Sequence, residues 1–303
     1  MSIFLMLIAV VLLFLFSIGK FSRQVQIVSG DKLKSILADV TATPLKGTVI
    51  GAILTSIIQS STATTVMLVG LVNAGLVSFY NSLGIVFGAN IGTTITSQLL
   101  AFNFEALAPL FVVAGFIIDK IENRWKRYGK SLFYFGLVFL CFALIEIIAA
   151  PFQSNQTILN ILEQIDGLTY AILAGAVLST VFQSSTVTTG IVITLAVQGL
   201  LSLEQSFGIV LGANIGTTST ALIASLVMDR AAKQTAVAHF LFNVIGVVII
   251  IPLFVPFLGF VGNLSDGIAS RIANAHLIFN LASAAIFLVF IKSFSSLVRL
   301  IVK

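Results

Sequence analysis

Two short polar motifs occur twice each in this chain, and their side chains are of the kind that bind ions through oxygen. Residues 59–65 read QSSTATT and residues 183–189 read QSSTVTT, while residues 88–94 and 212–218 both read GANIGTT. Both pairs share one offset, since 183 − 59 and 212 − 88 are each 124. Hydroxyl, amide and backbone oxygens suit a hard monovalent cation, and free N–H groups at helix N-termini suit an oxyanion. The motifs therefore predict a central ion site in a duplicated chain.

Charged side chains contribute little to these motifs, which limits the chemistry that the chain can perform. Glu146 is isolated within one apolar stretch, Glu204 lies near the start of another, and neither belongs to a repeated motif. No His/Cys/Asp/Glu cluster has transition-metal spacing and no nucleophile stands with a base, so we expect no transition metal, no cofactor and no enzymatic activity. An anion held without a protein cation needs compensation. Bound sodium would supply it and would couple the two binding events.

The composition places these motifs inside a membrane. Hydrophobic residues make up 58% of the 303 residues and charged residues 9%, whereas a soluble domain carries roughly a quarter of charged residues. The apolar runs are long and lack the alternation of a membrane β-barrel, so the backbone must form helices. We therefore expect an all-α polytopic membrane protein. The net charge of +5 comes from basic residues in short loops, which orient the chain and indicate no nucleic-acid partner.

The positions of the basic residues give the two repeats opposite orientations. Residues 20–46 and residues 119–130 each carry five Lys or Arg and are expected in the cytoplasm, whereas residues 151–167 carry none and are expected outside. One span separates the second cytoplasmic loop from the external segment. The first apolar run, residues 3–18, has no basic residue before it and is expected to be a retained span with its N-terminus outside. This inverted-topology repeat is typical of alternating access.

Each repeat is expected to contain a re-entrant helical hairpin. Between the two cytoplasmic loops lie three apolar stretches, residues 48–78, 83–101 and 106–118, yet only an even number can cross the membrane. The first stretch is interrupted by residues 59–62, so we expect it to return to its own side with this polar segment at its tip. Residues 168–199 would form the second hairpin, which enters from outside.

The two hairpin tips would meet near the middle of the membrane. Irregular backbone is tolerated at that depth only where it is buried in protein or lines a polar cavity, so the tips should define the site. Helices beginning at Ala63 and Val187 would point free N–H groups at it, which would stabilise an oxyanion.

The GANIGTT motif is expected to interrupt a crossing helix. Residues 84–94 place three glycines and an asparagine in the middle of a span, and residues 208–218 repeat them. Glycine costs a helix interior about 1 kcal/mol relative to alanine, so we expect unwound carbonyls that bind a cation beside Asn90, Thr93 and Thr94. The alternative is close helix packing through Gly-x-x-x-Gly, although packing alone requires neither Asn nor Thr.

The expected organisation follows from these spans. Two repeats, each with a hairpin, a broken helix and a further span, would be joined by one linking span. In chain order we expect an N-terminal span (1–19), a first repeat (20–130) with an interfacial segment, a hairpin (48–78), a broken helix (83–101) and a span (106–118), a linking span (131–150), a second repeat (151–261) with a hairpin (168–199), a broken helix (204–228) and a span (236–260), and a C-terminal span (262–303).

The paired motifs resemble those of the type II sodium-phosphate cotransporters and their bacterial relatives. The resemblance covers residues of about 40 to 260 and rests on a doubled, equally spaced pair of motifs, QSST-x-TT and GANIGTT. It implies sodium-coupled symport of inorganic phosphate into the cell by an elevator-like or rocking movement, within the lipid bilayer. It also implies a multi-pass protein of the bacterial cell (inner) membrane and a homodimer.

The resemblance further implies that residues 59–62 and 183–186 surround phosphate and sodium, with Asn90, Thr93, Asn214 and Thr217 beside them. The division of residues between the two ions is our own inference. Phosphate is expected beside the two hairpin tips, and sodium beside these tips and the glycine motifs. The phosphate residues are Gln59, Ser60, Ser61, Thr62, Gln183, Ser184, Ser185 and Thr186. The sodium residues are Gln59, Ser60, Thr64, Thr65, Asn90, Thr93, Thr94, Gln183, Ser184, Thr188, Thr189, Asn214, Thr217 and Thr218. His239 and His276 stand in the similar sequences AHFLFN and AHLIFN, which are offset by 37 residues, and they are expected to pack or hydrogen-bond helices.

Other functions stay open on the sequence alone. The cargo could be sulfate or another oxyanion, because hydroxyl and N–H donors bind an oxyanion whatever the number of protons it carries. A membrane sensor that binds phosphate without moving it is a different class, as is a subunit of a larger complex. A channel is disfavoured, since no span carries a continuous polar stripe.

Overall fold

The computed structural model describes residues 2–29, 43–101, 104–121, 125–151, 155–156 and 167–303. Every regular element in these ranges is a helix, and five helices there are long and apolar enough to cross a membrane. The prediction of an all-α polytopic membrane protein is therefore confirmed. The five candidate spans are Phe79–Ala101, Tyr128–Ala149, Leu203–Ser225, Arg230–Gly262 and Ile268–Val289.

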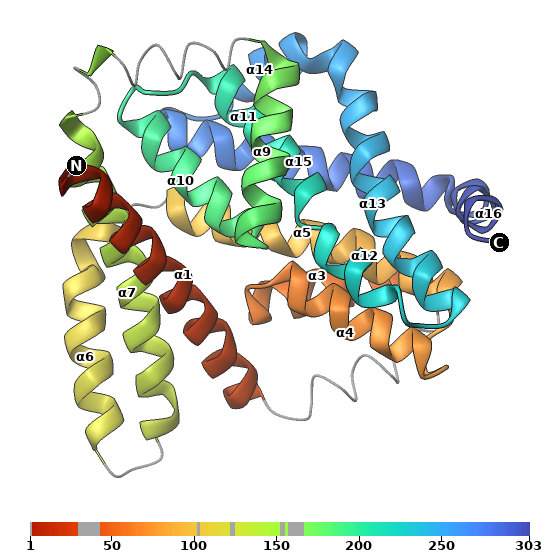
Figure 1. Cartoon of the computed structure of the whole chain (residues 1–303), viewed down its shortest axis with the longest axis horizontal. Coiled ribbons are helices and arrows are strands. Elements are labelled where there is room, and N and C mark those ends of the chain that lie inside the picture. The colour runs from red at the N-terminus through yellow and green to blue at the C-terminus, as the bar shows by residue number, and fades with distance from the viewer. Residues whose placement is uncertain (1, 30–42, 102–103, 122–124, 152–154, 157–166) are drawn as a thin grey trace.

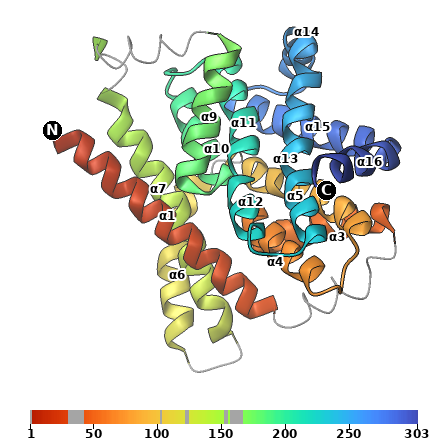
Figure 2. The same cartoon turned by 45° about the vertical axis from the view of Figure 1, so that its right-hand side comes forward.

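Three helices form a unit at one side of the molecule (Figures 1 and 2). They are α1 (Ser2–Ser29), α6 (Ala108–Lys120) and α7 (Lys126–Ala149), with the short η1 (Phe104–Leu107) before α6. Phenylalanine rings fill the space between α1 and α7, where the Phe14 and Phe142 centroids lie 4.7 Å apart. Helix α1 is longer than the expected first span. Of the expected interfacial segment, residues 20–29 belong to α1 and residues 30–42 lie outside the described residues.

The two repeats fold into the same succession of helices. Each begins with a pair of short helices separated by two residues, and the segment that carries the glycine motif follows, as one helix in the first repeat and as two in the second. In the first repeat these are α3 (Pro44–Ile58), α4 (Ser61–Asn73) and α5 (Phe79–Ala101); in the second they are α9 (Leu168–Phe182), α10 (Ser185–Val197), α11 (Leu203–Gly216) and α12 (Ser219–Ser225). Helix α3 packs along α5, and α9 packs along α11.

The expected broken helix of the first repeat is wrong, because α5 is a continuous helix through its glycine motif. The glycines are explained by packing: a Cβ added to Gly88 would overlap the carbonyl oxygen of Thr48 on α3. The second repeat has the same contact at positions 124 residues later, where a Cβ on Gly212 would overlap the carbonyl oxygen of Ile172 on α9. Two helices that approach this closely need glycine at the contact. The second repeat does contain an interruption, at residues 217–218 between α11 and α12.

The remaining helices follow α12 in the chain and pack against helices of both repeats. They are α13 (Arg230–Ile250), η3 (Ile251–Leu253), α14 (Phe254–Gly262), α15 (Ile268–Val289) and α16 (Ile291–Ile301). Phe87 of α5 stacks on Phe242 of α13 with ring centroids 4.9 Å apart, in a core that also includes Phe287 and Phe294. The expected C-terminal span is α15. Helix α16 was not expected as a separate element, and it lies beside the start of α13, where Arg230 Nε donates to the Val302 carbonyl oxygen (3.2 Å).

Candidate functional site

A left-handed glutamine ends the first helix of each repeat. Gln59 has φ 58° and Gln183 has φ 51°, and among the described residues these two are the non-glycine residues with positive φ. Non-glycine residues rarely adopt this conformation, so its occurrence at two equivalent positions points to a shared local design. The backbone reverses at each glutamine, and the next residue caps the following helix.

The serines that follow are helix N-caps in both repeats. Ser60 Oγ accepts from the Ala63 N–H (3.1 Å), and Ser184 Oγ accepts from the Val187 N–H (3.3 Å). The expectation that the Ala63 and Val187 N–H groups are free is therefore wrong, because the cap uses them. The N–H groups one and two residues earlier, at the start of α4 and of α10, have no intrahelical acceptor.

The second serine of each motif lies beside these N–H groups. Ser61 is 7% exposed and Ser185 is 2% exposed. Among the described residues, neither hydroxyl has a hydrogen-bond partner. Each repeat therefore presents a free hydroxyl together with free N–H donors at the start of a helix, which is a composition that suits an oxyanion.

The two repeats touch through these segments. Thr62 Oγ1 donates to the Gln183 carbonyl oxygen (3.2 Å) and lies 3.2 Å from Thr217 Oγ1. One threonine of the first tip thus contacts both the second tip and the interruption between α11 and α12. The structure brings together residues 62, 183 and 217, which the sequence had assigned to one site.

The hydroxyls assigned to sodium mostly donate to carbonyls of their own helices. Thr64 Oγ1 donates to the Ser60 carbonyl (3.1 Å), Thr188 Oγ1 donates to the Ser184 carbonyl (3.2 Å), and further residues of the set do the same. These further bonds join Thr65 to Ser61, Asn90 to Val86, Thr93 to Ala89, Thr94 to Ile91 and Thr218 to Ile215. A hydroxyl that donates its hydrogen keeps lone pairs for a cation, so these bonds orient the oxygens without consuming them. Thr189 Oγ1 is buried and has no partner in the described part of the chain.

The two copies differ in how the glutamine side chain is used. Gln59 is half-buried, and its Oε1 accepts a hydrogen bond from Thr96 of α5. Gln183 is exposed, and Thr220, which is the equivalent of Thr96, has a buried hydroxyl with no partner among the described residues. Equivalent residues of the two repeats therefore differ in their hydrogen bonding: the glutamine and threonine are bonded to each other in the first repeat and not in the second.

Two hydroxyl residues that the sequence analysis missed link each tip helix to its glycine motif. Ser56 Oγ lies 3.4 Å from the Gly92 carbonyl oxygen, and Thr180 Oγ1 donates to the Gly216 carbonyl oxygen at 3.2 Å. Both pairs obey the 124-residue offset. The signal was present in the sequence, since each residue stands three positions before its glutamine and is polar within an apolar helix.

A buried histidine joins the two repeats to α15. His276 Nδ1 lies 3.0 Å from Ser97 Oγ on α5, and its Nε2 lies 3.2 Å from Asn214 Oδ1 on α11. Asn214 Nδ2 donates to Asn280 Oδ1 (3.5 Å). The interpretation of His276 as a hydrogen-bonding group between helices is confirmed. Asn214, assigned to sodium, has both ends of its amide engaged by α15.

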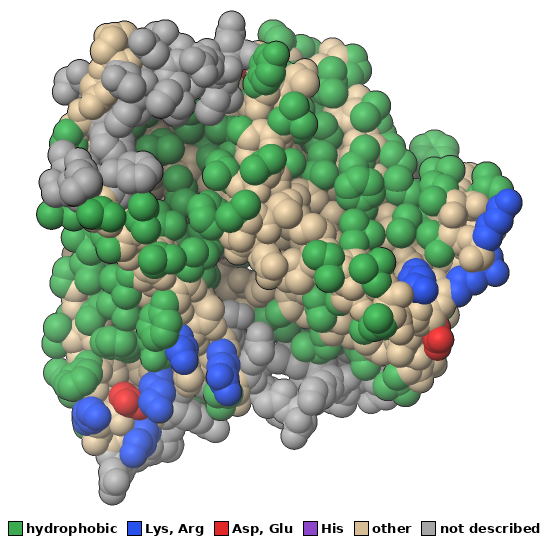
Figure 3. Space-filling model, in the orientation of Figure 1, with side chains coloured by type: hydrophobic (Ala, Val, Ile, Leu, Met, Phe, Trp, Pro, Cys, Tyr) green, Lys and Arg blue, Asp and Glu red, His purple; other side chains and the backbone are tan. Residues whose placement is uncertain are grey.

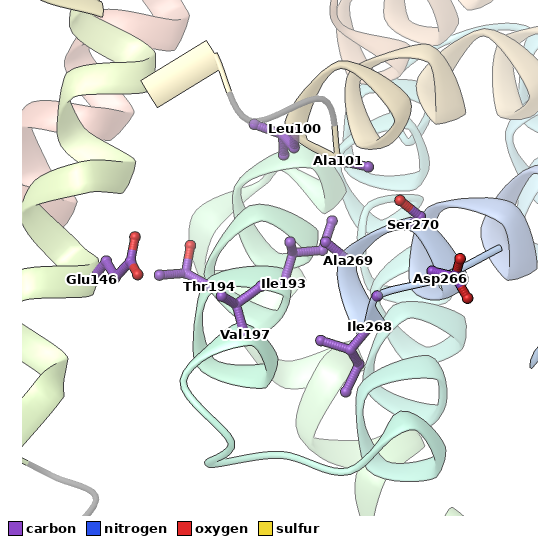
Figure 4. Close-up of a pocket in the computed structure, with 11 residues that line it drawn as sticks. Leu100, Ala101, Glu146, Ile193, Thr194, Val197, Asp266, Ile268, Ala269 and Ser270 are labelled. Carbon is purple, nitrogen blue, oxygen red and sulfur yellow. The ribbon is translucent and has the colours of Figure 1, made fainter. Parts of the chain in front are cut away.

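The cavity in Figure 4 lies away from both motifs. It has a volume of about 480 Å³ and lies between the end of α5, the end of α10, α7 and the start of α15, with Glu146 on one side and Asp266 on the other. Its lining includes Thr194, whose hydroxyl donates to the Gly190 carbonyl oxygen (3.1 Å). No residue assigned to phosphate or sodium lines it, so it does not define the candidate site.

Comparisons with known proteins agree with the position of these motifs. A family model described as Na+/Pi-cotransporter matches residues 13–146 and 153–255. The chain is 32% identical over 305 residues to the uncharacterized protein YqeW of Bacillus subtilis (strain 168), and the alignment covers 100% of this chain and 99% of that protein. No solved structure matches the chain.

Two further relatives carry functional descriptions. The chain is 27% identical over 280 residues to the putative inorganic phosphate export protein YjbB of Escherichia coli (strain K12), covering 91% of this chain and 51% of that protein. It is 22% identical over 385 residues to the sodium-dependent phosphate transport protein 2A of Mus musculus, covering 82% of this chain and 60% of that protein. The chain thus spans about half the length of the former relative and more than half of the latter.

Proposed function

The chain belongs to the Na+/Pi-cotransporter family, and from that premise we propose that it moves inorganic phosphate across a bacterial cell membrane together with sodium. The observation that carries the proposal is the contact between the two repeated tips through Thr62, Gln183 and Thr217. This contact supports a single shared site, because it joins the two segments that carry the free donors.

Phosphate in this site would be held by donors from both helix starts. The first N–H groups of α4 and α10 and the hydroxyls of Ser61 and Ser185 would replace part of its hydration shell, and the two helix dipoles would stabilise its charge. Sodium would bind beside it through hydroxyl and carbonyl oxygens of both motifs, because these are neutral hard ligands. The bound cation would compensate the anion, so each ion would raise the affinity for the other by the same factor.

The short helices support a re-entrant position for each tip. Helices α3 and α9 have 15 residues each and α4 and α10 have 13, which corresponds to about 20 Å, whereas the hydrocarbon core is about 30 Å thick. Each pair would therefore enter and return, with the glutamine and serines near the midplane. Irregular backbone at that depth would be shielded by the other repeat.

The orientation that we propose places the basic residues in the cytoplasm. Figure 3 shows Lys and Arg side chains gathered at the lower end of α1, α6 and α7 and, at the right, around the start of α13 and α16, with hydrophobic side chains over much of the remaining surface. This distribution supports an inverted repeat with a site that opens alternately to each side. A homodimer is part of the proposal on the strength of the family resemblance alone.

A second candidate function is phosphate export. The similarity to the putative phosphate export protein of Escherichia coli covers 91% of this chain and favours it. Sodium-coupled symport moves phosphate along the sodium gradient, which in most cells points inward, whereas an exporter would move phosphate outward without regard to that gradient.

Proteoliposomes separate these functions. Purified protein would be reconstituted, and labelled phosphate followed under an inward sodium gradient, an outward sodium gradient and equal potassium. The symporter moves phosphate in the direction of each sodium gradient and not in potassium. Phosphate flux that is the same under all three conditions would reject sodium coupling, and binding without flux would favour a sensor.

A further inference from the structure

Helices α13 and α15 carry the same pair of buried polar residues in different states. His239 and Asn243 on α13 correspond to His276 and Asn280 on α15, and all four side chains are at most 1% exposed. In both pairs the asparagine Nδ2 donates to the carbonyl oxygen of the histidine one turn earlier, at 3.0 Å in α13 and 2.8 Å in α15.

The rest of the hydrogen bonding differs completely. On α15, both histidine nitrogens and the asparagine Oδ1 have protein partners on α5 and α11. On α13, the corresponding three atoms, His239 Nδ1, His239 Nε2 and Asn243 Oδ1, are buried and have no partner among the described residues. Buried polar atoms are almost always satisfied in folded proteins, so these three on one helix face call for a partner that the described residues do not provide.

The packing of α13 against α4 places these atoms at the level of the site. The Asp229 N–H donates to Asn73 Oδ1 (2.8 Å), so the start of α13 meets the end of α4. Further along, Ala232 and Ala236 share a core with Val69. Both helices rise about 1.5 Å per residue, and ten residues lead from Asp229 to His239, while eleven lead back from Asn73 to Thr62.

The packing of α12 gives the same level independently. Ala221 of α12 belongs to the same core as Ala232 and Ala236, and α4, α12 and α13 lie side by side (Figures 1 and 2). Thr217 lies one turn before Ala221 in the chain. On α13, which runs in the opposite direction, His239 lies one turn after Ala236, so Thr217 and His239 lie at a similar height. Thr217 is also the residue that meets Thr62. Both registers therefore put His239 at the level of the contact between the two repeats.

We propose that His239 and Asn243 form a third wall of the phosphate site and select an oxyanion that carries a hydroxyl hydrogen. This inference rests on the proposed function, because it assigns the anion's specificity to residues outside the repeated motifs. A neutral imidazole offers one donor and one acceptor, and the Asn243 Oδ1 is an acceptor. The amide orientation is fixed, since Nδ2 must face the His239 carbonyl.

Hydrogen phosphate can pair the donor and one of the two acceptors in this set, whereas sulfate can pair only the donor. A P–OH group can donate to a buried acceptor, while an unprotonated phosphate oxygen accepts from the imidazole N–H. Sulfate has no hydrogen to donate at neutral pH, so the acceptors of α13 would stay unpaired when it binds. Sites that hydrogen-bond a substrate hydroxyl reject analogues that lack it, for this reason.

The test measures displacement of labelled phosphate from the purified full chain in sodium-containing buffer at mildly alkaline pH. The competitors are phosphate and arsenate, which keep a hydroxyl hydrogen, and sulfate and monofluorophosphate, which have none. In the wild type, the anions without hydrogen should need concentrations about 10- to 100-fold higher, the cost of leaving a buried acceptor unpaired. Sulfate that competes as well as phosphate would overturn the inference.

Two variants tie the discrimination to α13. Asn243→Leu should weaken phosphate binding by about 10- to 100-fold and leave sulfate binding unchanged. The difference between the affinities for phosphate and sulfate should therefore disappear. Asn280→Leu is the control, because it loses the same intrahelical bond on α15. It also removes the partner of Asn214 Nδ2, so the control is read from the ratio of phosphate to sulfate affinity, which should stay as in the wild type. If the Asn243→Leu variant does not fold, the same measurement is made on His239→Leu. If the folded α13 variant still prefers phosphate over sulfate as the wild type does, the inference is rejected. Absence of phosphate binding in the wild type would instead reject the proposed function itself.

Discussion

Replacing Gly88 by alanine should destabilise the protein strongly, whereas the same change at Gly70 should not. A Cβ on Gly88 would lie 2.7 Å from the Ala52 nitrogen and 2.8 Å from the Thr48 carbonyl carbon, and it would overlap the Thr48 oxygen. Favourable heavy-atom contacts lie at about 3.5 to 4.0 Å. Helices α3 and α5 would have to separate by on the order of 1 Å, because the contacted atoms are backbone and cannot rotate away.

The expected cost is about 2 to 3 kcal/mol, at the upper end of the range for overpacking a well-packed interior. Gly70 lies inside helix α4, and a Cβ there would meet nothing within 4 Å. Gly70→Ala should therefore be neutral or stabilising by up to about 1 kcal/mol, from helix propensity. Gly212→Ala provides an internal replicate, since its Cβ would lie 2.7 Å from the Ile172 carbonyl carbon.

The free energy of unfolding can be measured by titrating purified protein in mixed micelles with sodium dodecyl sulfate and following circular dichroism. A Gly88→Ala variant as stable as Gly70→Ala would refute the packing explanation. If such a variant also lost transport, the glycines would instead be required for unwinding α5 during the cycle.

Three further predictions follow from the contacts at the site. Thr62→Val removes the bonds to Gln183 and Thr217 and should lower the free energy of unfolding by about 1 kcal/mol. A double-mutant cycle with Thr217→Val should give a coupling energy of about 0.6 kcal/mol. A coupling energy of zero would show that this contact does not stabilise the protein. Ser61→Ala or Ser185→Ala should abolish sodium-driven phosphate flux with unfolding unchanged, because each removes a free hydroxyl without leaving a large cavity, and normal flux in both would reject the site assignment. His276→Leu should cost about 1 to 3 kcal/mol, since two buried partners on different helices lose their bonds; unaltered unfolding in the same titration would contradict this.

The helical class and the positions of the short helices were predictable from the sequence, because they depend on local composition. The interruption expected near residues 59–62 occurs at Gln59 and Ser60. The left-handed conformation of Gln59 was not predictable, since glutamine rarely adopts it and the surrounding helices impose it. The fate of the glycine motif was equally undetermined, because unwinding and close packing both require glycine. Only the neighbouring helix α3 decides between them.

The two histidines show the same limit at the level of single side chains. His239 and His276 stand in similar sequences, four residues before an asparagine. One finds partners on α5 and α11, and the other finds none in the described part of the chain. This difference depends on residues far away in the sequence, and no local pattern encodes it.

The proposed function requires that the two repeats share one phosphate site and that this site depends on sodium. The most direct test is equilibrium binding of labelled phosphate to the purified protein, at saturating sodium and in equal potassium, with the number of sites per chain determined. We expect one phosphate per chain in sodium and an affinity for phosphate that falls sharply in potassium. Two independent phosphates per chain, or binding that is the same in both salts, would contradict it.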